Sequence, residues 1–154
     1  MRECSCCFTG HRNIPYGDFD GIKEGTRSEI VRLIENGVTI FIAGGALGYD
    51  TLCANLVLEM KEIYSDVELR LALPCRNQTR GWAATDIDVY NRIIDMADCV
   101  TYVSENYDRG CMFKRNRYMA DNSAYCLAYC TKREGGSFYT VEYAKKCGSY
   151  IVMI

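Results

Sequence analysis

Residues 38–50 read Val-Thr-Ile-Phe-Ile-Ala-Gly-Gly-Ala-Leu-Gly-Tyr-Asp, an apolar run that leads at once into a glycine-rich turn. The run from Val38 to Ala43 is β-branched and apolar, which is the pattern of a strand buried on both faces. After the turn, apolar residues recur at helical spacing and predict a helix over 49–63. A strand, a turn and a helix in this order form the basic unit of a parallel α/β sheet.

The same alternation continues in both directions along the chain. Further strands are predicted at 3–8, 67–73, 99–103, 124–129 and 150–154. Further helices are predicted at 19–35, 78–96, 112–122 and 138–147. We therefore expect a single α/β domain over residues 1–154, with a Rossmann-like, doubly wound and mostly parallel sheet of about six strands and helices on both faces.

Length and composition agree with such a domain. The chain has 154 residues, 49% hydrophobic and 25% charged, which is ordinary for a globular protein. Its net charge of −2 gives no overall field that favours nucleic acid or an anionic membrane. No apolar run reaches the ~18 residues of a membrane helix, and no secretory segment begins the chain, so we expect a cytoplasmic protein without membrane contact.

The chain contains ten cysteines, scattered through the predicted strands and helices. We interpret them as reduced residues that pack as small hydrophobic side chains. A zinc site built from Cys4, Cys6 and Cys7 with Cys126 and Cys130 is the alternative. Neighbouring residues of a strand face opposite sides, and only one histidine is present, so no metal and no cofactor are predicted.

Unusual polar and glycine residues gather where the predicted strands end. In a right-handed doubly wound sheet these ends share one edge, where ligands bind. The residues concerned are Thr9-Gly10-His11-Arg12, Gly44-Gly45 with Asp50, Pro74-Cys75 with Gln78, Ser104 with Tyr107, and Gly135-Gly136 with Thr140. This clustering predicts one composite site.

Two glycine turns give that site its chemistry. Gly44–Gly48 and Gly135–Ser137 each lie between a predicted strand and a predicted helix. The first N–H groups of a helix are unpaired, the dipole is positive there, and glycine lets an anion approach the backbone. Both turns are therefore expected to bind phosphate, and Gly45→Asp is expected to abolish binding while leaving the fold intact.

Several motifs resemble the YpsA-like branch of the SLOG superfamily, and the resemblance extends over residues 4–154. They are Thr-Gly-His-Arg at 9–12, Gly-Gly-Ala-Leu-Gly-Tyr-Asp at 44–50, Leu-Pro-Cys at 73–75 followed by Gln78 and Trp82, and Cys-Met-x-x-Arg-Asn-Arg-Tyr-Met at 111–119. The resemblance implies a Rossmann-like fold and a nucleotide ligand. It does not by itself imply catalysis.

The LOG enzymes of the same superfamily release a base from cytokinin nucleotides and pair a catalytic arginine with a glutamate. Resemblance to them places Arg115 on the arginine and Glu142 on the glutamate. Glu134 replaces their proline, however, and Phe138-Tyr139 replace the Gly-Thr of their phosphate loop. Phosphate binding is expected to tolerate these changes better than hydrolysis.

The leading interpretation is a nucleotide-binding sensor or regulator whose ligand carries ribose and phosphate, such as ADP-ribose, an NAD-related or an AMP-type nucleotide. The predicted ligand-binding residues are Thr9, Gly10, His11, Arg12, Gly44, Gly45, Gly48, Asp50, Gln78, Ser104, Arg115, Asn116, Gly135, Gly136, Ser137 and Thr140. The alternative is an N-glycosidic hydrolase of nucleotides that uses Arg115 and Glu142.

A third interpretation, DNA handling as in the DprA relatives, is disfavoured by the acidic balance and by the absence of a basic-aromatic stripe. Nucleic acid is accordingly expected to be an unlikely partner. Trp82, Tyr90 and Tyr107 are candidates either for stacking on a base or for packing. Resemblance to the LOG enzymes, which pair through helices beside the pocket, implies a homodimer or a larger homo-oligomer.

Overall fold

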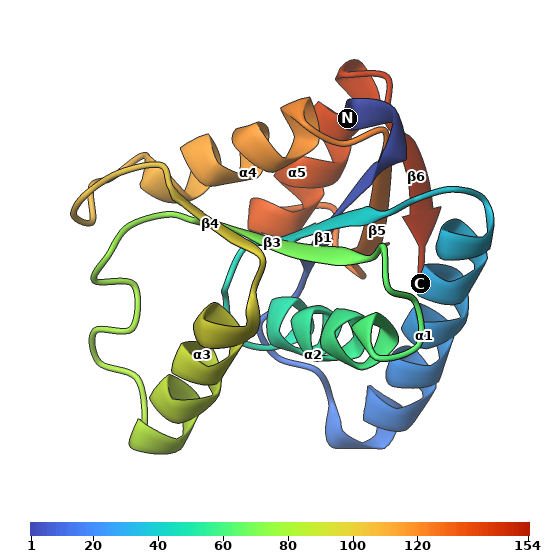
Figure 1. Cartoon of the computed structure of the whole chain (residues 1–154). Helices are drawn as coiled ribbons and strands as arrows, with labels where there is room; N and C mark the ends of the chain where they lie inside the picture. Colours follow the sequence, from blue (N-terminus) through green and yellow to red (C-terminus); the bar gives the residue numbers. More distant parts are fainter.

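Six parallel strands form the sheet at the centre of the molecule, in the order β4-β3-β2-β1-β5-β6 (Figure 1). The computed structural model describes residues 1–154. The strands are β1 (Ser5–Gly10), β2 (Ile40–Ala43), β3 (Glu68–Leu73), β4 (Cys99–Tyr102), β5 (Tyr125–Tyr129) and β6 (Tyr150–Met153). The chain begins in the centre, builds outward to β4 and then returns to the other side of β1.

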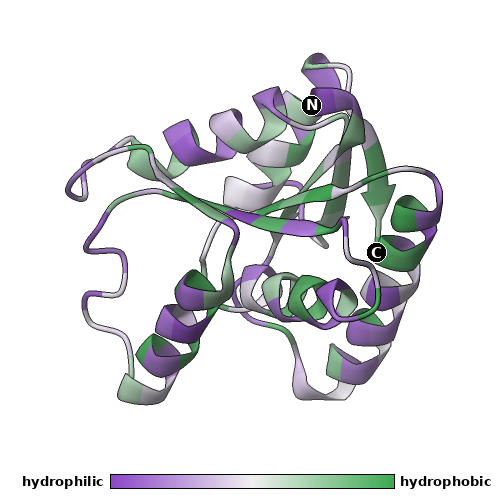
Figure 2. Ribbon diagram, in the orientation of Figure 1, coloured by the Kyte–Doolittle hydropathy of each residue, from purple (hydrophilic) through white to green (hydrophobic).

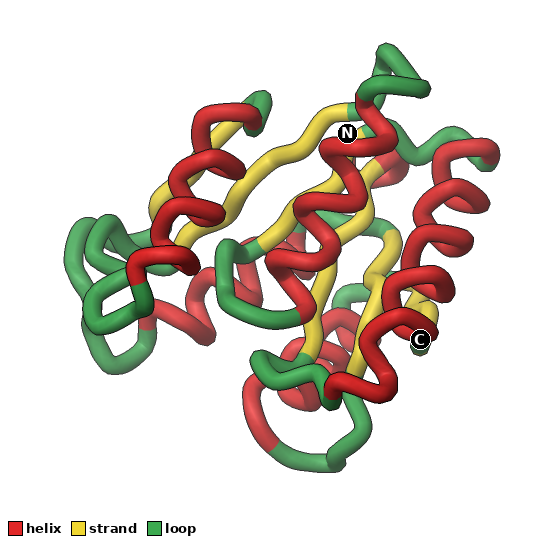
Figure 3. The backbone as a smooth tube through the Cα atoms, turned by 90° about the horizontal axis from the view of Figure 1, so that it is seen from below, coloured by secondary structure: helices red, strands yellow, loops and turns green.

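Five α-helices connect the strands and cover both faces of the sheet. They are α1 (Phe19–Glu35), α2 (Tyr49–Lys61), α3 (Ala84–Met96), α4 (Cys111–Asp121) and α5 (Gly135–Lys146). Figures 1 and 3 show α1, α2 and α3 on one face and α4 and α5 on the other. The predicted Rossmann-like, doubly wound α/β fold is confirmed.

Each central strand packs into two separate cores because its side chains alternate between the faces. Phe8 and Phe41 lie in the larger core with α1, α2 and α3, and their rings stack at 5.9 Å. Ile40 and Ile42 lie in the smaller core under α4 and α5. Figure 2 shows hydrophobic colour along the strands and hydrophilic colour on the outer faces of the helices. Burial on both faces explains why the strands read as continuous apolar runs.

Two helix starts differ from the sequence prediction by three residues or more. The third helix begins at Ala84 rather than at residue 78, because the segment before it forms a turn that passes through Gly81 at φ +83°. The fifth helix begins at Gly135 rather than at residue 138, so Gly135, Gly136 and Ser137 form its first turn. This second difference brings the N-terminus of α5 to the end of β5.

The ten cysteines are all unpaired, and six of them are buried. Cys6 and Cys53 belong to the larger core, while Cys7 and Cys126 belong to the smaller one. They occupy positions that a small apolar side chain would fill. None of the helices has the length and apolar character needed to cross a membrane.

Candidate functional site

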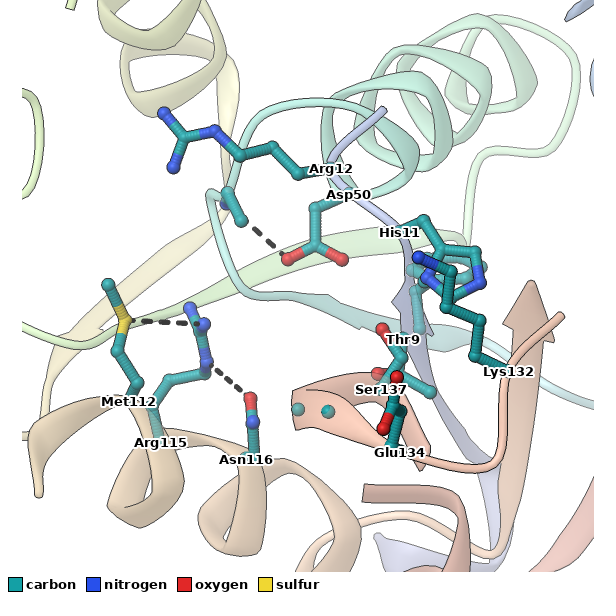
Figure 4. Close-up of a pocket in the computed structure, with 15 residues that line it drawn as sticks. Thr9, His11, Arg12, Asp50, Met112, Arg115, Asn116, Lys132, Glu134 and Ser137 are labelled. Atoms are coloured by element: carbon teal, nitrogen blue, oxygen red, sulfur yellow. Dashed lines mark hydrogen bonds between the residues drawn. The ribbon is translucent and has the colours of Figure 1, made fainter. Parts of the chain in front are cut away.

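A cavity of about 570 Å³ opens at the carboxyl ends of β1 and β5 (Figure 4). The order in which strands are added reverses here: β2, β3 and β4 follow on one side of β1, and β5 and β6 lie on its other side. Such a switch point is where open α/β sheets bind ligands. The cavity is lined by Phe8, Thr9, Gly10, His11, Arg12, Ala46, Asp50, Met112, Arg115, Asn116, Lys132, Glu134, Gly135, Gly136 and Ser137. Its walls thus come from the ends of β1 and β5 and from the starts of α2, α4 and α5.

The N-terminus of α5 forms one wall. Gly135, Gly136 and Ser137 line the cavity, and the N-cap residue Glu134 makes no side-chain hydrogen bond to the first turn. No atom lies within 4 Å of the Cβ position at either glycine. The unpaired N–H groups of the first turn are therefore accessible to an anion at the positive end of the helix dipole.

Arg115 approaches from α4 and is only 5% exposed. Its Nη1 donates to the carbonyl oxygen of Gly44, its Nε donates to Asn116 Oδ1 at 2.8 Å, and its Nη2 lies 3.8 Å from Met112 Sδ. Burial lowers the pKa of Arg115, and the carboxylate of Asp50 counteracts that shift. The guanidinium is thus held in a fixed orientation at the wall of the cavity.

Asp50 lies in the first turn of α2 and is 7% exposed. Burial raises the pKa of this carboxyl group, whereas Arg115 and the N–H groups of Ala46 and Gly44 oppose the rise. Arg115 Nη1 and Asp50 Oδ2 lie 2.6 and 2.8 Å from the Cβ position at Gly44, so the two charges are close to each other, although they form no direct ion pair. A ligand that enters here meets a buried acceptor and a buried cation.

His11 joins the ends of β1 and β5. Its Nε2 accepts a hydrogen bond from the Thr131 N–H at 2.8 Å, and the Thr131 hydroxyl lies 3.0 Å from the same nitrogen. Partial burial and the nearby charge of Lys132 lower the pKa of His11. The ring is therefore neutral and accepts at Nε2. The stabilisation of the folded state by this hydrogen bond is fully present above about pH 6.5, the ordinary pKa of histidine, and is lost as the pH falls through the lowered pKa of His11.

The first glycine turn differs from its prediction. Gly44, Gly45 and Gly48 do not line the cavity; of this turn only Ala46 does. A Cβ at Gly44 would lie 2.6 Å from Arg115 Nη1, and one at Gly48, where φ is +82°, would lie 2.0 Å from the Arg12 carbonyl oxygen. Close packing therefore requires these glycines. Asp50 Oδ2 accepts the Ala46 N–H at 3.4 Å, so that donor is already engaged.

The predicted outcome of Gly45→Asp is also corrected. Gly45 has φ +74°, and a Cβ there would lie 2.5 Å from Leu73 Cδ2. Both features oppose any side chain at this position, so we expect the substitution to damage the fold rather than to isolate ligand binding.

Four other predicted residues lie outside the cavity. Gln78 donates to the Gly44 carbonyl oxygen at 3.4 Å and accepts from the Tyr90 hydroxyl at 3.1 Å. Ser104 is half-buried and does not line the cavity. Thr140 is fully buried and donates to the Gly136 carbonyl oxygen at 2.9 Å, so its hydroxyl is used within α5.

Glu142 is the fourth of these residues. It lies seven residues beyond Gly135, about 10 Å along α5, and pairs with Lys145 at 3.2 Å. The structure therefore does not bring Arg115 and Glu142 together at the cavity. The residues that it does bring together are Thr9, Gly10, His11, Arg12, Asp50, Arg115, Asn116, Gly135, Gly136 and Ser137.

Sequence reasoning missed two charged residues of the cavity, Lys132 and Glu134. Both lie in the polar turn between β5 and α5, directly before Gly135. The rule that places strand-end residues at the ligand edge applied to them as well. The sequence prediction assigned the glycines of this turn to the site but not its two charged residues.

Fold and site together define a Rossmann-like α/β protein with a polar cavity at its topological switch point. The family model described as YspA SLOG family matches residues 6–151, and the chain belongs to this family. Relatives include UPF0398 proteins of Bacillus thuringiensis (strain Al Hakam) and Bacillus cereus (strain Q1). Each is 29% identical over 150 residues, which cover 91% of this chain and 82% of the relative.

Two solved structures of DNA processing protein A share the fold. The protein from Helicobacter pylori, described for its single-stranded DNA binding mode, superposes with a TM-score of 0.69 at 19% identity. The protein from Streptococcus pneumoniae also gives a TM-score of 0.69, at 15% identity. Each match covers 97% of this chain, which spans 64% and 49% of those two chains.

This likeness corrects the expectation that nucleic acid is an unlikely partner. A protein with the same fold binds single-stranded DNA, so neither the fold nor a net charge of −2 argues against nucleic acid here. Local positive charge at a binding edge, rather than the overall balance, governs contact with phosphates.

Proposed function

We propose that this protein binds a nucleotide in the 570 Å³ cavity and acts as a sensor or regulator. The supporting observation is that an uncapped helix N-terminus, a buried arginine and a buried carboxylate line the same cavity. These three groups match the phosphate and the ribose of a nucleotide. Helix N-terminal N–H groups and a guanidinium donate hydrogen bonds to phosphate oxygens, and a carboxylate accepts hydrogen bonds from ribose hydroxyl groups.

Each of these groups is assigned to one part of the nucleotide. The N–H groups of Gly136 and Ser137 and the guanidinium of Arg115 hold the phosphate, with Lys132 adding positive charge at the rim. Asp50 accepts from the ribose. Burial of Asp50 raises its pKa, so the carboxylate carries a desolvation cost that a hydroxyl donor from the ligand would reduce.

Binding without turnover is the better supported activity. The hydrolytic alternative assigns to Glu142 the stabilisation of the positive charge that develops on the sugar. Glu142, the glutamate assigned to that role by resemblance, pairs with Lys145 away from the cavity. Asp50 is the buried carboxylate of the cavity, and its place at the start of α2 suits ribose recognition.

The test compares Gly136→Asp with Gly136→Asn in calorimetric titrations with AMP, ADP, ADP-ribose and NAD. Position 136 is open, so both side chains fit, and an aspartate in the first turn also suits the helix dipole. We expect the wild type to bind at least one nucleotide. Gly136→Asp should weaken that binding about a hundredfold, because its charge opposes phosphate, while Gly136→Asn weakens it about tenfold or less.

Gly21→Asp adds the same charge at an open position of α1, outside the cavity, and should bind like the wild type. Melting temperatures of the three variants verify that each one folds. Equal affinity of wild type and Gly136→Asp for every nucleotide would exclude this cavity as the phosphate site.

Single-stranded DNA is a second candidate ligand, suggested by the DprA protein of Helicobacter pylori. Its phosphodiester groups present the same anionic oxygens to the same donors. Anisotropy of a labelled oligonucleotide at physiological salt measures this binding. Displacement of the oligonucleotide by a mononucleotide would place the strand in the cavity, whereas no anisotropy change would exclude it.

A further inference from the structure

A second cavity adjoins the first and differs from it in chemistry. It has a volume of about 390 Å³ and shares Arg12 and Met112 with the 570 Å³ cavity. Its other lining residues include Arg80, Trp82 and Tyr107, and none is acidic. The first cavity, in contrast, contains the carboxylates of Asp50 and Glu134.

The second cavity offers larger and more exposed aromatic rings to a ligand than the first. Of the two rings that line the first cavity, Phe8 is 0% exposed, and His11 is fixed by Thr131 and by an edge contact with Tyr129 at 5.2 Å. In the second cavity, Tyr107 is 63% exposed and Trp82 is partly exposed. Nucleobases stack on such rings whatever their sequence, since every base has a π-face.

The walls of the second cavity are held in place by contacts between two loops. Asn77 Oδ1 accepts the Tyr107 N–H at 2.9 Å, and the Arg76 N–H donates to the Glu105 carbonyl oxygen at 3.0 Å. The rings of Trp82 and Tyr90 pack in a T-shaped arrangement with centroids 5.5 Å apart. A preformed cavity binds more tightly because little side-chain freedom is lost on binding.

Arg12 lies at the border of the two cavities. Its guanidinium carbon is 5.7 Å from the ring centroid of Trp82, a cation–π distance, so the aromatic ring supports the cation. A phosphate bridge at this border would contact Arg12, with one nucleoside on each side of it. Two adjoining cavities with Arg12 between them thus provide places for two linked nucleosides.

We propose that the cavity formed by Arg12, Arg80, Trp82 and Tyr107 is a base-stacking subsite, and that the ligand consists of two nucleosides joined through phosphate at Arg12. This inference rests on the proposed nucleotide site and names its ligand class. Both a pyrophosphate-linked dinucleotide and a phosphodiester-linked strand have this chemistry.

The experiment uses the fluorescence of Trp82, which is the single tryptophan of the chain. The full chain is titrated with AMP, with diadenosine diphosphate and with the phosphodiester dinucleotide ApA, and calorimetry measures each affinity in parallel. We expect AMP to bind without changing the emission. At least one dinucleotide should quench it and bind about tenfold more tightly. The linkage that is preferred identifies a free dinucleotide or a nucleic acid strand as the source.

Two variants separate stacking from folding. Trp82→Ala and Tyr107→Ala should each weaken dinucleotide binding about tenfold and leave AMP binding unchanged. Tyr150→Ala is the matched control, because Tyr150 is 64% exposed and lies at the start of β6, away from both cavities. If Trp82→Ala fails to fold, Tyr107→Ala still tests the subsite.

Each other outcome overturns the inference. AMP binding combined with no quenching by either dinucleotide removes the second subsite and leaves the proposed function intact. Quenching by AMP as strong as that by the dinucleotides overturns the ligand of two nucleosides. Absence of binding by all three compounds overturns the ligand of two nucleosides, whereas the proposed function is overturned only if ADP, ADP-ribose and NAD also fail to bind.

Discussion

The two glycine turns have similar sequences but different surroundings in the structure. After β2, glycines are required because Arg115, Asp50 and the Arg12 carbonyl group occupy the space that a side chain would need. After β5, Gly135 and Gly136 have no atom within 4 Å of their Cβ positions and open on the cavity. The first turn is filled by the protein itself, whereas the second remains accessible. A glycine-rich turn in a sequence can therefore indicate close packing as well as ligand access.

The largest expected effect is a difference in the free energy of unfolding between substitutions in the two glycine turns. Gly48→Ala places a methyl group 2.0 Å from the Arg12 carbonyl oxygen at φ +82°, so it should reduce the free energy of unfolding by about 4 kcal/mol. Gly136→Ala meets open space and should change it by about 0.5 kcal/mol or less. Urea unfolding measures both. Similar losses in the two variants would remove the distinction between a filled and an open turn.

A second effect tests the charges that fill the first turn. Arg115→Met removes the buried cation that opposes the rise in the pKa of Asp50, and it also removes the Arg115 hydrogen bond to the Gly44 carbonyl group. Leaving the buried Asp50 carboxylate without this nearby cation should cost about 2 kcal/mol at neutral pH. The loss of Arg115 raises the pKa of Asp50 further. The destabilisation should therefore be greatest above that pKa and should shrink as the pH falls through it and the carboxyl group becomes neutral.

Thermal unfolding of wild type and Arg115→Met between pH 4 and pH 7 measures this trend. Adding Asp50→Asn to Arg115→Met removes the unpaired charge and should restore part of the lost stability. A loss that does not vary with pH would show that Asp50 and Arg115 do not interact.

The smallest expected effect lies within the open turn. Thr140→Val loses the hydrogen bond to the Gly136 carbonyl group and should cost about 1 kcal/mol of stability without changing nucleotide affinity. Ser137→Ala should weaken nucleotide binding without changing the stability, because Ser137 lines the cavity and Thr140 does not. Calorimetry and urea unfolding of both variants make the comparison. If Thr140→Val weakened nucleotide binding at unchanged stability, the Thr140 hydroxyl would contact the phosphate and this prediction would be wrong.

The sequence determined the α/β class, the six strands and the edge at which polar residues collect. These features depend on local patterns: apolar runs for strands buried on both faces, helical spacing, and glycine where a strand meets a helix. It therefore also placed Thr9, Asp50, Arg115 and Gly136 at that edge.

Only the tertiary structure decided which edge residues share a cavity. In the structure, Gln78 and Thr140 donate hydrogen bonds to backbone carbonyl groups, and Glu142 pairs with Lys145. Lys132 and Glu134, in contrast, line the cavity. The physical reason is that the use of a polar group depends on the partners that distant segments bring to it. Spacing along the chain does not specify those partners.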